Sequence, residues 1–304
     1  MGAPPSRRIR VIYNPSAGFK AGLPTNRASA DEVRAAMARH GLGDELVVAE
    51  SEDEAVAAAR AAADAGYDVV VAAGGDGTVG TVACEMLYRE TALGVLPLGS
   101  VMNIARMLEI PRDLDAAAAI IARGETRVID VGEAKGTIFF EAGSVGMNAA
   151  IFREAQRFDE GEYRSLFTGL WVAVRYHPAR MRVELDDGMV RTRALMVTVA
   201  NGPYTGIGFT VAPAARLDDG KFDVRVFQRF SRWELLRHFG AIAFGRRRYS
   251  PKVRTYRSAR VRIESVHPLP CRADHHDLGT TPIDFVVRQA ALRVVVPHAP
   301  PGLE

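Results

Sequence analysis

The stretch VVVAAGGDGTVG at residues 69–80 decides how the first half of this chain folds. Its β-branched run predicts a buried strand over residues 68–73, and the apolar spacing that follows predicts a helix over residues 79–88. Three glycines, an acid and a threonine join the two. Glycine lets main-chain N–H groups come close to a ligand, and a helix presents a positive N-terminal end. The junction therefore favours an anion, most often a phosphate group.

The chain on either side of this stretch alternates strands with helices. Strands are predicted at residues 8–13, 46–49, 93–98 and 127–131, and helices at residues 31–40, 53–65, 102–108 and 114–122. Near-continuous apolar strands interleaved with helices are typical of a parallel sheet that is covered on both faces. The first part of the chain is therefore predicted to be an α/β domain.

From about residue 132 the pattern changes to strands separated by turn signals. These strands are expected at residues 138–141, 181–185, 190–200, 222–227, 261–263 and 283–287. Helical spacing interrupts them at residues 153–176 and 232–244. A last apolar strand at residues 292–297 is free to pair in either part. The pattern indicates a mainly antiparallel second domain.

Composition and charge narrow the classes of protein to consider. With 304 residues, 48% hydrophobic and 25% charged, the chain is long enough for two domains with buried cores. The formal net charge of +3 gives no reason to expect nucleic acid as a partner. Cys84 and Cys271 form no C-x-x-C pair, which favours a reduced, cytoplasmic setting. No segment has the roughly 18 uninterrupted apolar residues of a membrane span.

Three loops of small residues follow predicted strands of the first domain: Asn14–Gly18, Gly74–Gly80 and Gly99-Ser100. In open α/β sheets, ligands bind beyond the carboxyl ends of the strands, and these loops fall at that edge. Asp76 lies among the amides, where its charge would repel a phosphate unless a cation intervened. Mg²⁺ bridges carboxylate and phosphate oxygens, so the loop predicts Mg²⁺. The alternative is that each glycine only makes a tight turn between strand and helix.

Two common nucleotide-binding motifs do not fit. Gly75, Gly77 and Gly80 match the G-x-G-x-x-G dinucleotide pattern, but the next strand ends in Gly99-Ser100, with no acid placed to bind a ribose. The sequence also has no G-x-x-x-x-G-K-[ST] motif, and therefore no Walker lysine for β- and γ-phosphates. The three loops therefore match neither of these nucleotide-binding motifs.

Four segments in this order strongly resemble the diacylglycerol kinase catalytic family, which includes bacterial lipid kinases and the sphingosine and ceramide kinases. They are NPSAG at residues 14–18, GGDGT at 74–78, LPLGS at 96–100 and APAARLDDGKFD at 212–223. GGDGT alone is shared with NAD kinases, whereas the four together are more specific. The resemblance implies an α/β ATP-binding domain at residues 1–132 with 291–304, and a β-sandwich lipid-substrate domain at residues 133–290.

The resemblance also implies an enzyme of phospholipid biosynthesis that transfers the γ-phosphate of ATP to a lipid hydroxyl with Mg²⁺. Carried over by position, the ATP contacts are Asn14, Pro15, Ser16, Ala17, Gly18, Gly74, Gly75, Asp76, Gly77, Thr78, Val79, Gly80 and Ser100. Asp76 is expected to be catalytic as well. Arg216, Asp219 and Lys221 fall where bacterial members hold a structural Mg²⁺; a plain hairpin turn is the alternative.

The chain departs from the family pattern in two places. Where the family has G-T-x-N-D-F-A-R, this chain has GSVMNIAR at residues 99–106. Where the family has D-G-E, with the glutamate as base for the lipid hydroxyl, this chain has Asp274-His275-His276. His276 falls at the base position, and an imidazole can act as general base at neutral pH.

Other interpretations of this second departure stay open. Asp274 is a candidate to orient the imidazole, and Asp277 is an alternative base through a shifted register. A surface loop or an inactive site would instead make the chain a lipid- or nucleotide-binding homologue that has lost phosphate transfer. A kinase of a soluble substrate such as NAD is a further hypothesis, although the chain has no N-E pair of the NAD-kinase type after the glycine loop.

Two stretches are candidates for contact with lipid. Leu166, Phe167, Leu170, Trp171 and Val174 form one apolar helical stripe, for which core packing is the alternative. The second is a basic run, Arg246-Arg247-Arg248-Tyr249 continued by Lys252, Arg254, Arg257, Arg260 and Arg262. It would attract an anionic membrane surface, with a solvated basic edge as the alternative. The expected partners are ATP and a membrane lipid at the inner face of the membrane, with homodimer formation left open.

Overall fold

The computed structural model describes residues 7–17, 19–20, 23–24, 26–156, 175–206, 208–228, 230, 234, 237 and 252–298. The chain divides into two compact units. Unit 1 comprises Met1–Ile129 with Ala290–Glu304, and unit 2 comprises Asp130–Gln289. The predicted fold class, an α/β part followed by an antiparallel β-sandwich, is confirmed by the strand pairing within each unit.

Unit 1 is built on a parallel sheet with the strand order β4–β1–β5–β6. These strands are Leu46–Val48 (β4), Ile9–Tyr13 (β1), Val69–Gly74 (β5) and Ala92–Pro97 (β6). The end of β20 (Ile283–Val296) pairs with β6 in parallel. Every residue of β5 and β6 is buried, as a sheet covered on both faces requires.

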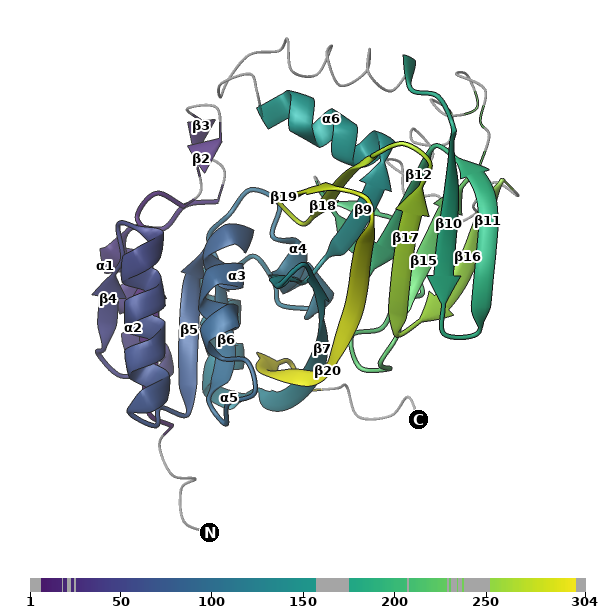
Figure 1. Cartoon of the computed structure of the whole chain (residues 1–304). Helices are drawn as coiled ribbons and strands as arrows, with labels where there is room; N and C mark the ends of the chain where they lie inside the picture. The colour runs from purple at the N-terminus through teal and green to yellow at the C-terminus, as the bar shows by residue number, and fades with distance from the viewer. Residues whose placement is uncertain are drawn as a thin grey trace. The chain divides into compact units, whose positions relative to one another are not determined.

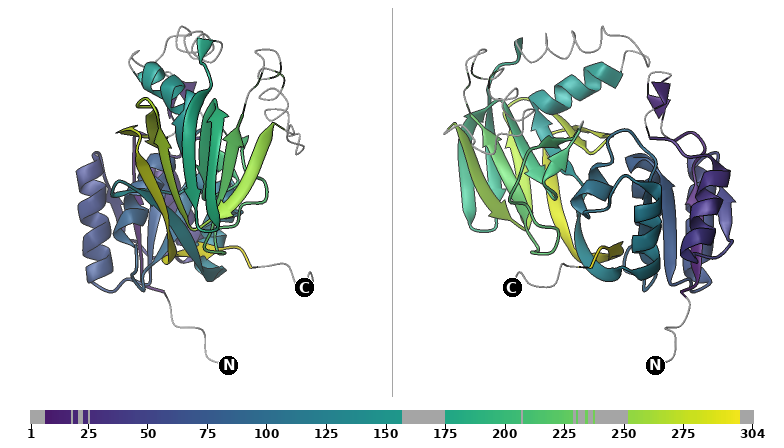
Figure 2. Two further views of the ribbon diagram at one scale, coloured as in Figure 1. Left: turned by 45° about the vertical axis from the view of Figure 1, so that its right-hand side comes forward. Right: turned by 180° about the vertical axis from the view of Figure 1, so that it is seen from behind.

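The helices among the described residues of unit 1 are α1 (Ala30–His40), α2 (Glu52–Asp64), α3 (Asp76–Glu85), α4 (Asn103–Met107) and α5 (Leu114–Arg123). α1 packs against α5, and α2 packs against α3. The chain moves along the sheet in one direction from β1 to β4 and in the other direction from β4 to β5. Because crossovers between parallel strands are right-handed, α1 and α2 therefore lie on opposite faces of the sheet. Figure 1 looks onto α2 and α3, and the view from behind in Figure 2 looks onto the other face. A short ribbon, β2 (Phe19–Lys20) with β3 (Leu23–Pro24), follows β1.

The described residues of unit 2 form two large antiparallel sheets and the small ribbon of β13 (Tyr204–Thr205) with β14 (Phe209–Thr210). The first has the order β16 (Val253–Ser258), β15 (Phe222–Phe227), β12 (Met196–Ala200), β9 (Ala142–Gly146), β18 (Pro270–Ala273) and β19 (His276–Thr280). In the second, β11 (Gly188–Ala194), β10 (Ala179–Leu185) and β17 (Arg260–Ser265) lead to β20. The remaining elements are β7 (Glu125–Ala134), β8 (Thr137–Phe139) and α6 (Met147–Gln156).

The core of unit 2 lies between its two sheets. Phe139 stacks on Phe222 with ring centroids 5.6 Å apart, and Phe285 meets Phe139 edge-on at 6.0 Å. Gly143 on β9 is required here, because a Cβ at this position would lie 2.2 Å from the ring of Phe285. A glycine therefore lets an aromatic ring press directly on a strand backbone, which closes the sandwich.

The structure corrects several predicted elements. The single strand predicted over residues 190–200 is two strands, β11 and β12, which belong to different sheets. The two strands predicted at residues 283–287 and 292–297 are one continuous strand, β20. β9, β16, β18 and β19 were not predicted. Most of the predicted helix at residues 153–176, the apolar stripe within it, most of the helix at 232–244 and Arg246–Tyr249 lie outside the described residues.

Candidate functional site

The glycine-rich junction of unit 1 forms the first turn of a helix. β5 ends at Gly74, Gly75 is the N-cap of α3, and Asp76 is the first helical residue. The helix predicted to begin at residue 79 thus begins at Asp76, and no side chain caps it. Because the first N–H groups of a helix have no acceptor within it, this end offers amide donors and a positive dipole to an anion.

The loop after β1 is tied to this turn by Asn14. The Asn14 side-chain amide donates to Thr78 Oγ1 at 2.9 Å, and its main-chain N–H donates to the Ala73 carbonyl at 3.0 Å. Asn14 Oδ1 in turn accepts from the Ser16 N–H at 2.9 Å. The Thr78 side chain lies over Gly74, where a Cβ would come within 2.5 Å of it. The first two small-residue loops therefore meet, and glycine is required at position 74.

The loop after β6 packs against the same turn. The Leu98 N–H donates to the Gly74 carbonyl at 3.0 Å. A Cβ on Gly99 would lie 2.8 Å from the Gly75 Cα and 2.6 Å from the Met102 sulfur, so the two backbones touch. The third loop thus joins the other two, with Ser100 next to this contact in sequence.

Asp76 connects α3 to α4. Its Oδ2 accepts the N–H of Asn103 at 3.1 Å, and its Oδ1 accepts the N–H of Ile104 at 2.9 Å. The N-cap of α4 is Met102, whose φ of 57° lies in the left-handed region and which makes no side-chain cap. Asp76 therefore caps α4 from a distant part of the chain. This structural task was not predicted. The two amides leave each carboxylate oxygen a lone pair, so Asp76 still fits a Mg²⁺ ion.

The predicted ATP contacts differ in whether the structure leaves them available to a ligand. The Val79 side chain is fully buried and its N–H donates to the Gly75 carbonyl at 2.9 Å, so neither group is available to a ligand. Pro15, Ser16 and Ala17 form a turn after β1, and Gly80 lies inside α3. Gly18 lies outside the described residues. The site that the geometry supports is thus the first turn of α3, flanked by the Asn14 and Gly99 loops.

The turn predicted to hold a structural Mg²⁺ contains a cation of the protein's own. The Asp219 carboxylate is ion-paired with Arg257, and it also accepts the N–H of Lys221 at 3.1 Å. Arg216 pairs with Asp218 instead, at 3.0 Å. No group of three or more His, Cys, Asp or Glu residues able to hold a metal ion occurs among the described residues. A guanidinium thus neutralises the Asp219 carboxylate in this arrangement, and the metal role of Arg216, Asp219 and Lys221 stays a prediction.

This arrangement predicts how the turn responds to metal removal. EDTA should leave the melting temperature of the wild-type protein unchanged. Arg257→Gln should lower it by about 2–4 °C, because a half-exposed ion pair contributes about 1 kcal/mol. Thermal unfolding measured with and without EDTA checks both results. Arg254→Gln is the control, because it removes from the same strand an arginine that has no ion pair among the described residues. A wild-type protein that loses several degrees in EDTA would show that a metal ion is bound after all.

Asp274 holds the backbone in place at the turn between β18 and β19. Its carboxylate accepts three main-chain N–H groups, from Phe140 at 2.7 Å and from Glu141 and Ala142 at 3.0 Å. Burial raises the pKa of Asp274, while these three donors oppose the rise. The carboxylate is thus turned to the backbone of residues 140–142 and makes no hydrogen bond to His276 among the described residues, so the structure gives no support to the hypothesis that Asp274 orients the imidazole.

His276 is the first residue of β19 and is exposed. Its ring lies 3.9 Å, centroid to centroid, from that of His275. The alternative base, Asp277, accepts both Nε and Nη2 of Arg153 at 2.7 and 2.6 Å. The hydrogen bonds from Arg153 lower the pKa of Asp277, so this carboxylate is a weak base. Of the candidate bases, His276 alone is both accessible and without an arginine partner in the described part of the chain.

Two further residues position the site and were not predicted. Arg112 Nη2 donates to the Gly99 carbonyl at 2.7 Å, and the Asn26 amide donates to the Pro97 carbonyl at 2.5 Å. Both side chains hold the loop that follows β6. A side chain that bonds to a distant carbonyl leaves no periodic pattern in a sequence, so no signal indicated them.

Comparison with known proteins identifies relatives of both units. Residues 8–134 match the family described as diacylglycerol kinase catalytic domain, and residues 142–296 match the family described as YegS C-terminal NAD kinase beta sandwich-like domain. A protein named diacylglycerol kinase from Staphylococcus saprophyticus is 24% identical over 300 residues, which is 96% of each chain. A protein of the same name from Staphylococcus aureus is 25% identical and covers 96% of this chain and 93% of its own.

The fold has a solved counterpart. A crystal structure of a diacylglycerol kinase from Bacillus anthracis superposes with a TM-score of 0.74 at 17% identity, over 97% of this chain and 99% of that one. At this identity the likeness supports the fold and not the substrate. The fold and the relatives nevertheless extend over both units, and not over the glycine loops alone.

Proposed function

Because this chain belongs to the diacylglycerol kinase catalytic-domain family, we propose that it is an ATP-dependent lipid kinase. It would transfer the γ-phosphate of ATP to a hydroxyl group of diacylglycerol or a related lipid. The observation that supports this most strongly is the meeting of three loops around the uncapped N-terminus of α3. That arrangement offers main-chain donors to a phosphate chain without a Walker lysine.

The residues of unit 1 would act mainly by positioning. Phosphoryl transfer is catalysed by alignment and by stabilisation of charge on the phosphate oxygens. The amides of Gly77 and Thr78 would bind phosphate oxygens at the start of α3. The Asp76 carboxylate would keep the Gly99 loop beside them through its bonds to Asn103 and Ile104. When bound, Mg²⁺ would neutralise phosphate charge, with Asp76 as the carboxylate that holds it.

We propose His276 of unit 2 as the group that accepts the proton of the lipid hydroxyl. A neutral imidazole has a ring nitrogen with a lone pair, so it can act as a general base at neutral pH. The geometry of Asp274 and Asp277 leaves this residue as the base candidate of the β18–β19 hairpin.

The proposal is tested by measuring ADP release with diacylglycerol, ceramide, sphingosine, phosphatidylglycerol and NAD as separate acceptors. One of the lipids should support Mg²⁺-dependent turnover, and NAD should not. His276→Ala should reduce that turnover by about 10²–10⁴-fold, the range of general base catalysis, with the melting temperature unchanged because the residue is exposed. His275→Ala is the matched control and should retain turnover. Equal losses in the two variants would remove the base assignment while leaving the kinase assignment intact.

A second candidate function is a lipid- or nucleotide-binding homologue without transfer. It is favoured by one observation: the Asp274 carboxylate is held by three backbone amides and makes no hydrogen bond to His276 in the described part of the chain. The same assay separates the two. ATP binding without ADP release for any acceptor would favour this second function.

We propose that the protein contacts the membrane at its surface. Within the described residues, no helix is both long and apolar enough to cross a membrane. Docking of this chain on a membrane surface is part of the proposal, and the sequence predicts a basic run for that purpose.

A further inference from the structure

The predicted basic run is partly neutralised in the part that the structure describes. Lys252 pairs with Glu234 at 2.7 Å, and Arg257 pairs with Asp219. Arg262 contacts both Glu264 and Asp284 at 3.0 Å. Arg254 and Arg260 have no carboxylate partner among the described residues, so the ion pairs of the other three weaken the attraction of residues 252–262 for anions without removing it.

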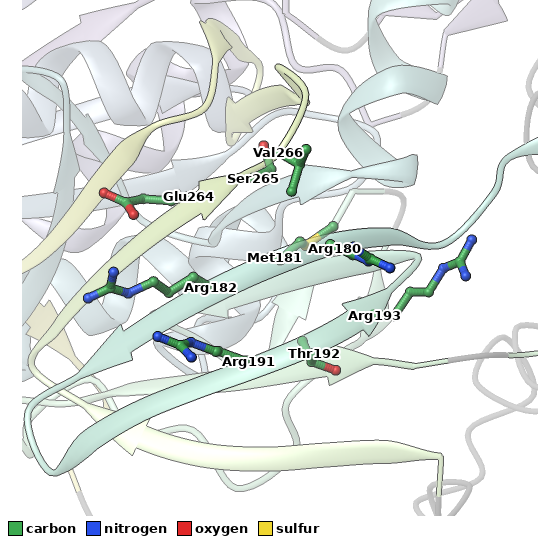
Figure 3. Close-up of a pocket in the computed structure, with 9 residues that line it drawn as sticks. All are labelled: Arg180, Met181, Arg182, Arg191, Thr192, Arg193, Glu264, Ser265 and Val266. Atoms are coloured by element: carbon green, nitrogen blue, oxygen red, sulfur yellow. The ribbon is translucent and has the colours of Figure 1, made fainter.

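A different arginine cluster lines a pocket of about 560 Å³ on the second sheet of unit 2. The pocket lies over β10, β11 and the end of β17 (Figure 3). Its arginines are Arg180, Arg182, Arg191 and Arg193, which we call the arginine pocket. The other lining residues are Met181, Thr192, Glu264, Ser265 and Val266. All four guanidinium groups belong to exposed residues.

Strand register brings these like charges directly together. Arg180 is paired with Arg193 across β10 and β11, and Arg182 is paired with Arg191. The four side chains alternate with Met181 and Thr192, so they lie on one face of the ribbon. Like charges directly opposite each other destabilise an antiparallel pair. Two such pairs in succession therefore cost stability, a cost that an anionic ligand would offset.

The carboxylates near the pocket neutralise it only in part. Glu184 pairs with Arg182 at 2.6 Å; Glu264, which lines the pocket across from Arg182, has its ion pair with Arg262. Arg193 donates to the Pro178 carbonyl at 3.0 Å, a neutral partner. Among the residues that the structure describes, Arg180, Arg191 and Arg193 thus have no carboxylate partner, and three cations remain for a ligand.

Exposed apolar side chains accompany these cations. Val266, which lines the pocket, is 69% exposed, and Met189 on β11 is 45% exposed. Met189 is paired with Glu184 across the same two strands. A membrane surface offers both phosphate groups and an apolar layer beneath them, so it matches this combination. None of the described residues that line the pocket is an aromatic on which a nucleic acid base would stack.

We propose that the arginine pocket docks unit 2 on an anionic membrane surface. The guanidinium groups of Arg180, Arg191 and Arg193 bind lipid phosphates, and Val266 and Met189 contact the apolar layer at the rim. This surface is separate from the glycine loops, and its test needs neither ATP nor turnover.

The test is co-sedimentation of the full chain with vesicles of phosphatidylcholine, with and without 30% phosphatidylglycerol. We expect binding only to the anionic vesicles, weakening as salt is raised. Each arginine near an anionic surface is worth about fivefold in binding, so Arg180→Gln with Arg191→Gln should weaken binding about 30-fold. Its melting temperature should stay level or rise, because a like-charge pair is relieved on each side.

Two controls keep the result specific. Arg34→Gln with Arg60→Gln removes the same net charge from exposed, ion-paired positions of unit 1 and should change vesicle binding less than twofold. Glycerol phosphate at millimolar concentration should not release the protein from vesicles. Equal losses in the two double variants, binding to neutral vesicles, or release by glycerol phosphate would overturn the proposal; the last result would indicate a pocket for a soluble phosphate ester.

Discussion

Asp76→Ala should lower the melting temperature of the ligand-free, metal-free protein by about 6–12 °C and reduce kinase turnover at least 10²-fold. The carboxylate accepts the N–H groups of Asn103 and Ile104, and two hydrogen bonds to a charged acceptor are together worth about 3 kcal/mol. Without them α4 loses its cap, and the Gly99 loop is free to move away from α3. A displacement of about 1 Å at a reacting centre is enough for the loss of turnover.

The ligand-free melting temperature is the decisive reading. If Asp76 did no more than hold Mg²⁺, its loss would abolish turnover but leave the ligand-free protein as stable as before. Asp53→Ala is a suitable control, because it also removes a carboxylate from the first turn of a helix, α2. In the described part of the chain, the Asp53 side chain makes no hydrogen bond that joins two loops. An unchanged melting temperature in Asp76→Ala would refute the capping role.

Gly99→Ala should have the second large effect. The added Cβ would lie 2.8 Å from the Gly75 Cα, a backbone atom that cannot rotate away. Forcing the two loops apart should cost about 2 kcal/mol and lower the melting temperature by about 4–8 °C. ATP affinity should fall about tenfold or more, because the α3 amides and the loop after β6 would no longer face one phosphate chain. Thermal unfolding and ATP titration calorimetry measure the two effects.

Gly75→Ala is the matched variant, since it changes the same contact from its other side. A Cβ on Gly75 would lie 3.8 Å from the Gly99 Cα, which is ordinary van der Waals contact, and its φ of −83° suits alanine. We expect its melting temperature to stay within about 2 °C of the wild type. Equal stability losses in the two variants would mean that the close approach of the two loops does not carry the effect.

The central strands of unit 1 could be predicted from the sequence because their signal is local. Residues 69–73 of the predicted strand are valine or alanine and glycines follow them, and the structure has β5 at Val69–Gly74. The start of α3 was missed because Asp76 and Gly77 have low helix propensity in a helix interior, whereas both are well suited to a first turn. At the start of α3, the position of these residues in the first turn mattered more than their helix propensity.

The strands of unit 2 were harder to predict, because their partners decide them. β9 has the sequence AGSVG, which has low β-propensity, yet it pairs with β12 on one side and β18 on the other. β11 and β12 were read as one strand because no turn residue separates them; Leu195 alone joins two strands of different sheets. Neither feature can be read from the segment itself.

In the candidate site, too, local features could be predicted and long-range contacts could not. Its residue types were predictable, since glycines beside a helix N-terminus indicate a phosphate whatever surrounds them. The partners of the charged groups were not predictable. Arg257 reaches Asp219 from 38 positions away in the chain, and Asp76 caps a helix that begins 27 positions later. These long-range contacts give both predicted ligand residues a structural role: Asp219 is ion-paired, and Asp76 caps a helix.

The most direct test is a crystal structure of the protein with Mg²⁺ and a non-hydrolysable ATP analogue. The account predicts β- and γ-phosphate oxygens within hydrogen-bond distance of the Gly77 and Thr78 amides at the start of α3. Phosphates bound elsewhere in unit 1, with the first turn of α3 making no contact with them, would contradict it.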